Sequence, residues 1–302
     1  MTHKSLRFRV VDGLLIALMI VPLLAGMAIK VLTTPAAEGI EITGARIYCT
    51  LPMPIQDLPI TESQINSWLV MLSMLGLCLY LTHGIAVRPQ SKRQLAAEWA
   101  VEKVNGLIAD NMGQRFKGFA PFVAAIMALS ALSSLMSLLG LRPPTSDMNV
   151  VAGWAIAVFV IITHYKLKGG LLPYVKGFFE PMVIFAPFNI IGEFATPVSM
   201  SFRHYGNVLS GLVISTLVAT ALQGLSRLLL GWLPGVLGEI PFLQVGLPAV
   251  LSLYFDIFSG LMQAFIFAML TMLYIATGFP EEEYEQRKQR KADRKNRRLN
   301  AA

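Results

Sequence analysis

Six long apolar segments with almost no charged residues dominate this sequence of 302 residues. Only 14% of the residues are charged, whereas a soluble protein has about 25%. A segment of about 20 apolar residues can cross a bilayer as a helix, and lipid offers the backbone of any other structure no hydrogen-bond partner. We therefore predict an all-α polytopic membrane protein with about six membrane helices. The predicted segments are residues 10–32, 65–87, 119–141, 150–165, 178–233 and 242–279.

The last two apolar segments are too long for one straight crossing each. Residues 178–233 and 242–279 need strong tilt, a break or a hairpin that lies at an angle in the membrane. Pro181, Pro187 and Pro197 are candidate kinks in the first of them, because proline removes a helical hydrogen bond. We expect the two segments to form a long tilted hairpin.

Basic residues gather in alternate loops between the apolar segments. Cytoplasmic loops of membrane proteins carry the excess of Lys and Arg, so six crossings with both termini in the cytoplasm account for the alternation. The net charge of +7 then needs no nucleic-acid partner, because the basic residues are not interleaved with aromatic ones. The basic regions are residues 2–9, 88–117, 166–176 and the tail after 279, and the loops with at most one basic residue are 34–64, 140–149 and 231–241.

Several segments outside the long apolar runs leave alternatives open. The N-terminus could be a signal peptide ending near Ala36-Ala37, but its apolar core is longer than about 15 residues, so we expect an uncleaved helix. Residues 94–108 have apolar side chains at helical spacing and form either an amphipathic helix on the cytoplasmic surface or a solvated connector. The tail from 281 to 298 is a solvated helix former that could also contact anionic lipid. Cys49 and Cys78 indicate neither a disulfide framework nor a metal site.

A charged residue, Arg203, stands in the middle of the fifth apolar segment. An Arg at the centre of a membrane helix costs about 2.5–3.5 kcal/mol and is usually retained for function. The alternative is an Arg that holds helices together by pairing with a carboxylate. At 100° per residue, Arg203 shares one face with small and neutral polar residues, which allow another helix to approach closely. This face, the Arg203 strip, comprises Gly192, Thr196, Ser199, Arg203, Gly206, Asn207 and Ser210.

Further ionisable residues lie in or near the two long segments. Glu193 points to a different side of the helix from Arg203, and His204 is either a proton relay or a residue at a helix interface, the latter being favoured slightly. Asp256 could take up and release protons, or it could form a salt bridge with Arg203. Asp256 belongs to a second polar stripe at helical spacing, with Ser252, Ser259, Gly260, Gln263 and Tyr274.

The segments SMSFRHYGNVLSG (199–211) and FDIFSGLMQAFIFAMLTMLYI (255–275) resemble subunit a of F-type ATP synthases. PTSDMNVVAGWA (144–155) and EWAVEKVNGLIADNMG (98–113) extend the resemblance to roughly residues 66–279. The resemblance implies three regions: an extra N-terminal helix and external loop at 1–65, a subunit-a-like core at 66–279 and a basic cytoplasmic tail at 280–302.

The resemblance also implies a function. Subunit a translocates ions, most often protons, through two half-channels that meet at the Arg, here Arg203, against a rotating c-ring of proteolipid subunits. This resemblance implies peripheral stalk subunits of the b type and membrane lipid as partners. It implies a bacterial inner membrane as the location. It implies no cofactor and no metal, and no enzyme activity of the chain on its own. The implied ion pathway comprises Asn207, Asp256, Gln263, Glu193, Ser199, Ser210 and His204.

The sequence departs from common patterns of this family at three places. Leu212 stands where many members carry a carboxylate, and Asp256 stands where some have His, so we expect Asp256 to serve one half-channel. His204-Tyr205 replaces the usual Leu-Phe or Leu-Tyr. Two alternatives to the stator subunit remain open from the sequence: a secondary transporter with an anion site at Arg203, and a non-transporting assembly protein.

Overall fold

The computed structural model describes residues 3–33, 44–54, 56–87, 91–232, 243 and 246–299, with side chains outside 3–7 and 291–299. Ala36, Ala37 and Arg88 lie outside the described residues. Within these ranges the chain is almost entirely helical, and six helical spans are long and apolar enough to cross a membrane. They confirm the six predicted segments and cover Phe8–Thr33, Glu62–Thr82, Gln114–Leu139, Met148–Gly169, Val183–Leu230 and Leu247–Thr277.

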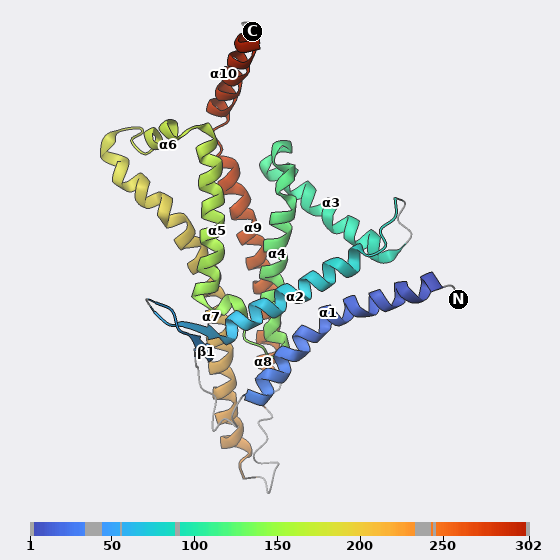
Figure 1. Ribbon diagram of the computed structural model, residues 1–302. Helices are drawn as coiled ribbons and strands as arrows, with labels where there is room; N and C mark the ends of the chain where they lie inside the picture. The colour runs from blue at the N-terminus through green and yellow to red at the C-terminus, as the bar shows by residue number, and fades with distance from the viewer. Residues whose placement is uncertain are drawn as a thin grey trace.

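The first two spans form an antiparallel helical pair (Figure 1). Helix α1 (His3–Thr33) packs along α2 (Glu62–Thr82). A side chain at Gly76 would place its Cβ 2.7 Å from the backbone nitrogen of Met19, so the close approach requires glycine. Ser73 donates a hydrogen bond of 2.7 Å to the carbonyl of Met19 at the same crossing. Between the two helices, β1 (Ile47–Leu51) and β2 (Leu58–Thr61) form an antiparallel hairpin where we predicted only a loop.

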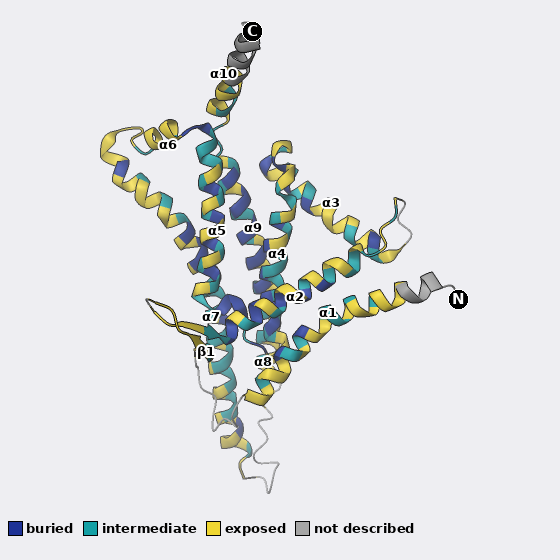
Figure 2. Ribbon diagram, in the orientation of Figure 1, coloured by how far each residue is buried: buried dark blue, intermediate teal, exposed yellow. Residues whose placement is uncertain are grey.

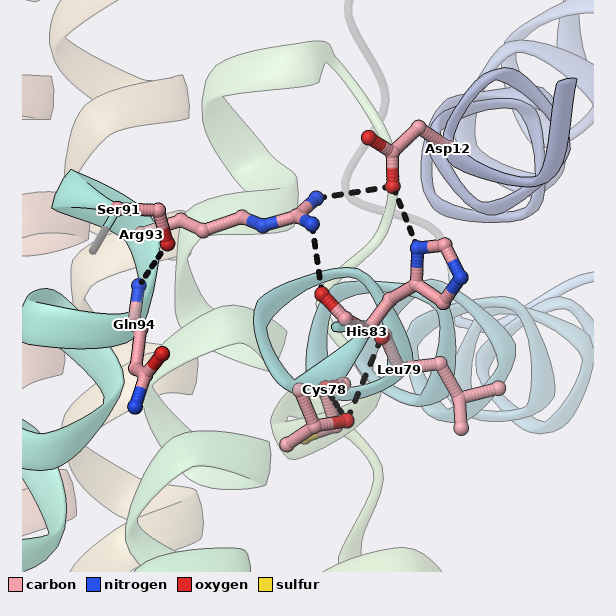
Figure 3. Close-up of polar contacts among 8 residues, drawn as sticks. Asp12, Cys78, Leu79, His83, Ser91, Arg93 and Gln94 are labelled. Atoms are coloured by element: carbon pink, nitrogen blue, oxygen red, sulfur yellow. Dashed lines mark hydrogen bonds and ion pairs between the residues drawn. The ribbon is translucent and has the colours of Figure 1, made fainter. Parts of the chain in front are cut away.

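A polar cluster ties α1 to the start of α3 (Lys92–Met112), as Figure 3 shows. Asp12 Oδ1 lies 2.8 Å from both His83 Nδ1 and Arg93 Nη1, and Arg93 Nη2 donates a hydrogen bond of 2.6 Å to the carbonyl of His83. The hydrogen bond to Asp12 raises the pKa of the Arg93 guanidinium. Asp12 is a carboxylate inside a membrane span that the sequence analysis did not single out, and its partners satisfy it within the chain.

The hydrophobic core lies between α3, α4 (Ala120–Leu135), α5 (Met148–Lys166) and α9 (Gly260–Thr277). Figure 2 shows the buried residues concentrated in these helices and in the middle of α7. Helix α3 confirms the helix predicted at 94–108: Val104 and Ile108 are buried in the core, whereas Leu95 and Trp99 are exposed. Short turns connect the long helices: η1 (Gln114–Phe119), η2 (Met136–Leu139), η3 (Pro144–Ser146), η4 (Leu167–Gly169), α6 (Leu171–Gly177) and η5 (Val183–Phe185).

Helix α7 (Ala186–Leu230) has 45 residues and is therefore about 68 Å long, more than twice the roughly 30 Å of a bilayer core. It runs obliquely past α5 in Figure 1, so the predicted tilt is confirmed. The apolar segment predicted from 178 is interrupted before α7. Pro187 occupies the first turn of α7, where proline is tolerated. Pro197 lies inside the helix without ending it.

The chain returns along α7 through α8 (Leu247–Ser252), the π-helical turn η8 (Leu253–Ser259) and α9, which completes the predicted hairpin. Helix α10 (Glu281–Leu299) follows and confirms the helix predicted for the tail. Cys49 and Cys78 are both free and exposed.

Candidate functional site

The Arg203 strip lies on the open side of α7. Arg203 is exposed and forms no hydrogen bond or ion pair with any other described residue. A Cβ added at Gly192 or at Gly206 would meet no atom within 4 Å. At these two glycines the strip therefore does not pack against another described helix of the same chain, and the exposed surface around Arg203 is free for another molecule.

A second side of α7, about 100° around the helix from Arg203, is packed into the core. His204 is fully buried, its Nε2 lies 3.3 Å from Ser130 Oγ, and its ring contacts Trp154 and Phe267 edge-on. His204 thus lies at the interface of α7 with α4, α5 and α9. Its Nδ1 is buried without a hydrogen-bond partner among the described residues. The other buried residues of this His204 face are Pro197, Met200, Ser201 and Gly211.

Asp256 does not pair with Arg203 within the described part of the chain. It accepts a hydrogen bond of 2.5 Å from Ser252 instead. Both lie around the π-helical turn η8, and π-helical turns occur often at functional sites. One turn further on, Ser259 Oγ donates to Asn207 Oδ1 at 2.9 Å, which joins η8 to the edge of the Arg203 strip.

The remaining predicted pathway residues differ in their exposure. Ser199 and Ser210 lie exposed on the Arg203 strip, and Ser210 donates a hydrogen bond of 2.6 Å to the carbonyl of Gly206. Gln263 is buried on α9, with 5% of its surface exposed. The structure therefore joins Asn207 to the η8 turn, keeps Ser199 and Ser210 beside Arg203, and leaves Gln263 in the helix interface.

Glu193 belongs to a separate cluster, near the α10 end of the molecule. Lys166 Nζ lies 2.7 Å from Glu193 Oε2 and 2.9 Å from Oε1, and the hydroxyl of Tyr174 donates to Oε1 at 3.3 Å. Burial and the charge of Glu193 raise the pKa of the Tyr174 phenol, so this hydroxyl stays protonated as a donor. Ten residues separate Glu193 from Arg203, about 15 Å along the helix axis.

Two hollows meet at the Lys166–Glu193 ion pair. The outer hollow, of about 450 Å³, is lined by Tyr174, Asn189 and Glu283 in addition to the pair. The inner hollow, of about 240 Å³, is lined by the pair together with Thr196 and Tyr274. Thr196 belongs to the Arg203 strip, so the inner hollow opens on the helix face that leads to Arg203.

A third hollow, of about 310 Å³, lies at the other end of the molecule. Leu212 lines it together with Glu62 from the start of α2. Glu62 has 8% of its surface exposed, and its Oε1 has no hydrogen-bond partner in the described part of the chain. A buried carboxylate from another helix therefore lines the same hollow as Leu212.

The sequence analysis missed Lys166, Tyr174 and Glu62 as site residues. Lys166 was counted only as a basic residue of a loop, because positive charges near helix ends are expected there. Helical periodicity could not predict its contact with Glu193, which is 27 residues away in sequence, because the two residues lie on different helices. The signal that could have singled out Glu62 is its place directly before an apolar segment.

The fold and this site define a multi-pass α-helical membrane protein with charged and polar side chains inside its spans. The family model of the ATP synthase A chain matches residues 64–276, and the chain belongs to this family. The matched region begins within α2 and ends within α9, so α1, the β-hairpin and α10 lie outside it.

Named relatives agree with the family. ATP synthase subunit a, sodium ion specific, of Propionigenium modestum is 28% identical over 83% of this chain and 89% of its own length. ATP synthase subunit a of Priestia megaterium is 32% identical over 74% of this chain and 94% of its own length. ATP synthase subunit a 1 of Crocosphaera subtropica is 30% identical over 74% of this chain and 89% of its own length.

Proposed function

We propose that this chain translocates ions, in the first place protons, through two half-channels that meet at Arg203 beside a rotating ring of proteolipid subunits. The flow is coupled to ATP synthesis or hydrolysis by a soluble head. One observation carries the proposal: Arg203 is exposed on a strip of small residues and has no partner among the described residues. An unpaired Arg in a membrane span is costly, and a carboxylate on a neighbouring subunit would offset that cost.

The proposed chemistry at Arg203 is electrostatic. A ring carboxylate that faces lipid is protonated and neutral, and a nearby positive charge lowers the pKa of such a group by about 1–3 units. The proton then leaves as the carboxylate approaches Arg203. An Arg suits this role because its guanidinium remains charged at any accessible pH. The strip residues Gly206 and Ser210 leave room for the ring helix to approach.

Each half-channel uses polar groups at one end of α7. Towards the β-hairpin end, the proposed path uses Asp256 and Asn207, with Gln263 in the adjoining helix interface. Towards the α10 end it uses Glu193 and the two hollows beside it. The basic loops assign the α10 end to the cytoplasm. His204 has two proposed roles, an interface residue or a proton relay. Its packing against three helices favours the interface role.

We further propose that the core at 66–279 acts with peripheral stalk subunits in the plasma membrane of a bacterium, and that 1–65 and 280–302 are additions to it. The match of the family model to residues 64–276 supports these boundaries, and the organisms of the relatives support the location. The family assignment leaves the secondary-transporter and assembly-protein hypotheses without support.

The test is ATP-driven acidification of inverted membrane vesicles that contain the whole complex, with the native chain and with Arg203→Ala at matched assembly. Loss of acidification with the complex still assembled supports Arg203 as the gate between the half-channels. Undiminished acidification removes that role. Because one relative is named as sodium ion specific, the measurement is repeated over a sodium titration, and sodium uptake in place of acidification would change the ion but retain the mechanism.

A further inference from the structure

The ion pair between Lys166 and Glu193 separates the two hollows at the α10 end of α7. Both side chains line both hollows. The outer hollow is bounded by residues of α6, α7 and the start of α10, and the inner one by residues of α5, α7 and α9. The point where the ammonium and carboxylate groups touch therefore lies on the border between the two hollows.

We propose that Lys166 is a positioning residue that holds Glu193 as a charge-dependent gate between the outer and the inner hollow. This inference rests on the proposed function and adds a residue and a mode of operation to it. Lys166 acts through its ion pair with Glu193 and not through a contact with Arg203. Thr196, on the wall of the inner hollow, lies seven residues before Arg203, which is about 10 Å along the helix.

The geometry gives the gate two states. In the closed state Glu193 is a carboxylate, and Lys166 Nζ contacts both of its oxygens at 2.7 and 2.9 Å. When a hydronium ion in one hollow gives its proton to a Glu193 oxygen, an O–H bond forms and a water molecule is released. The carboxyl group is now neutral, so the attraction that held the ammonium group is lost. The proton leaves Glu193 to water in the other hollow, and the ion pair forms again.

Two neighbours limit how the pair can move. Tyr174 donates to Glu193 Oε1 and so holds this oxygen from the outer side. Gly278 lets the Lys166 stem pass, because a Cβ at this position would lie 2.9 Å from Lys166 Cε. The titratable and charged groups that line the hollows around Glu193 are Lys166 on α5, Tyr174 on α6, Tyr274 on α9 and Glu283 on α10. Lys166 is the only cation among those lining residues.

The experiment measures the rate of ATP-driven proton uptake into inverted vesicles as a function of the pH of the medium. Each rate is divided by the rate of uncoupled ATP hydrolysis by the same complex. We expect Lys166→Gln to move the alkaline limb of this profile to higher pH, because Glu193 then lacks the ammonium group that contacts both of its oxygens. Lys166→Arg retains the ion pair and should keep the native profile. Lys168→Gln is the matched control, since it removes the same charge two residues away, from a side chain that packs over the Tyr165 ring.

Tyr174→Phe provides a second variant should Lys166→Gln fail to assemble. It removes one hydrogen bond to Glu193 and leaves both charges, so a smaller shift in the same direction is expected. An unchanged profile in an assembled Lys166→Gln complex overturns the gate, as does an unchanged Tyr174→Phe profile where only that variant assembles. Arg203→Ala separates this failure from that of the proposed function: if Arg203→Ala abolishes uptake while the Lys166→Gln profile is native, only the gate is wrong.

Discussion

Two sides of α7 differ in exposure and in packing. The Arg203 strip is exposed and has open space at Gly192 and Gly206, whereas the His204 face is closed by Ser130, Trp154 and Phe267. Arg203 and His204 are adjacent in sequence, but a helix turns about 100° between them. The comparison teaches that one helix can be both a core element and an open working surface, and that mutations on its two sides should fail in different ways.

The largest expected effect on activity is that of Arg203→Ala. Because Arg203 is exposed and has no hydrogen bond or ion pair with another described residue, its loss should not lower the thermal stability of the extracted complex. Proton pumping should fall at least about tenfold, since the barrier to direct leakage and the partner of the ring carboxylate are both removed. A melting curve measured beside the pumping assay checks this. A lower melting temperature would show that the strip has a structural role, and the contrast between the two sides would be lost.

His204→Ala should give the opposite pattern. It removes a ring packed between α4, α5 and α9, and deleting such a buried ring costs about 3–5 kcal/mol in soluble cores. We expect less subunit in the membrane and a lower melting temperature of the complex. His204→Phe keeps the ring volume and serves as the control. Full pumping by His204→Phe supports an interface role, and loss of pumping from a well-accumulated His204→Phe complex would make His204 a proton relay.

Two glycines of α7 provide a matched pair with an intermediate effect. A Cβ at Gly206 meets nothing within 4 Å, whereas a Cβ at Gly211 would lie 3.0 Å from the Phe255 side chain. Gly211→Leu should therefore disturb the packing of α7 on η8 and reduce accumulation of the subunit. Gly206→Leu should leave accumulation unchanged and lower pumping several-fold, by obstructing the ring. Quantitative immunoblots and pumping rates distinguish the two, and native pumping by Gly206→Leu would contradict a ring contact at the strip.

The smallest expected effect is at the boundary between the two sides, where Asn207 bonds to Ser259. Hydrogen bonds between membrane helices contribute about 0.6 kcal/mol on average. Asn207→Ala should thus change the stability of the extracted complex very little, and Ser259→Ala should do the same. Pumping should fall by roughly threefold if the bond only orients η8, which follows from that energy. A larger loss would support the place of Asn207 in the proposed ion path, and a threefold loss would limit its role to orienting η8.

Two clusters of ion pairs show the same contrast between a structural role and a proposed role in ion transport. Asp12, His83 and Arg93 satisfy one another and tie together three helices near the N-terminus (Figure 3). Lys166 and Glu193 also pair, but hollows lie on both sides of them. The hollows beside the second pair provide the space that a moving proton and its water molecules need.

The sequence by itself determined the six spans, the tilt of α7 and the composition of the Arg203 strip. These depend on local properties, namely apolar length, helical periodicity and the cost of a charge in lipid. The same reasoning placed Arg203 and His204 on different sides of one helix. The tertiary structure decided which side is open, that Asp256 bonds to Ser252 rather than to Arg203, and that Lys166 pairs with Glu193. Lys166 and Glu193 lie on different helices, so no regular spacing along the chain encodes their contact. Ser252 and Asp256 share a stripe at helical spacing, but only the fold decides that Asp256 bonds within this stripe and not to Arg203.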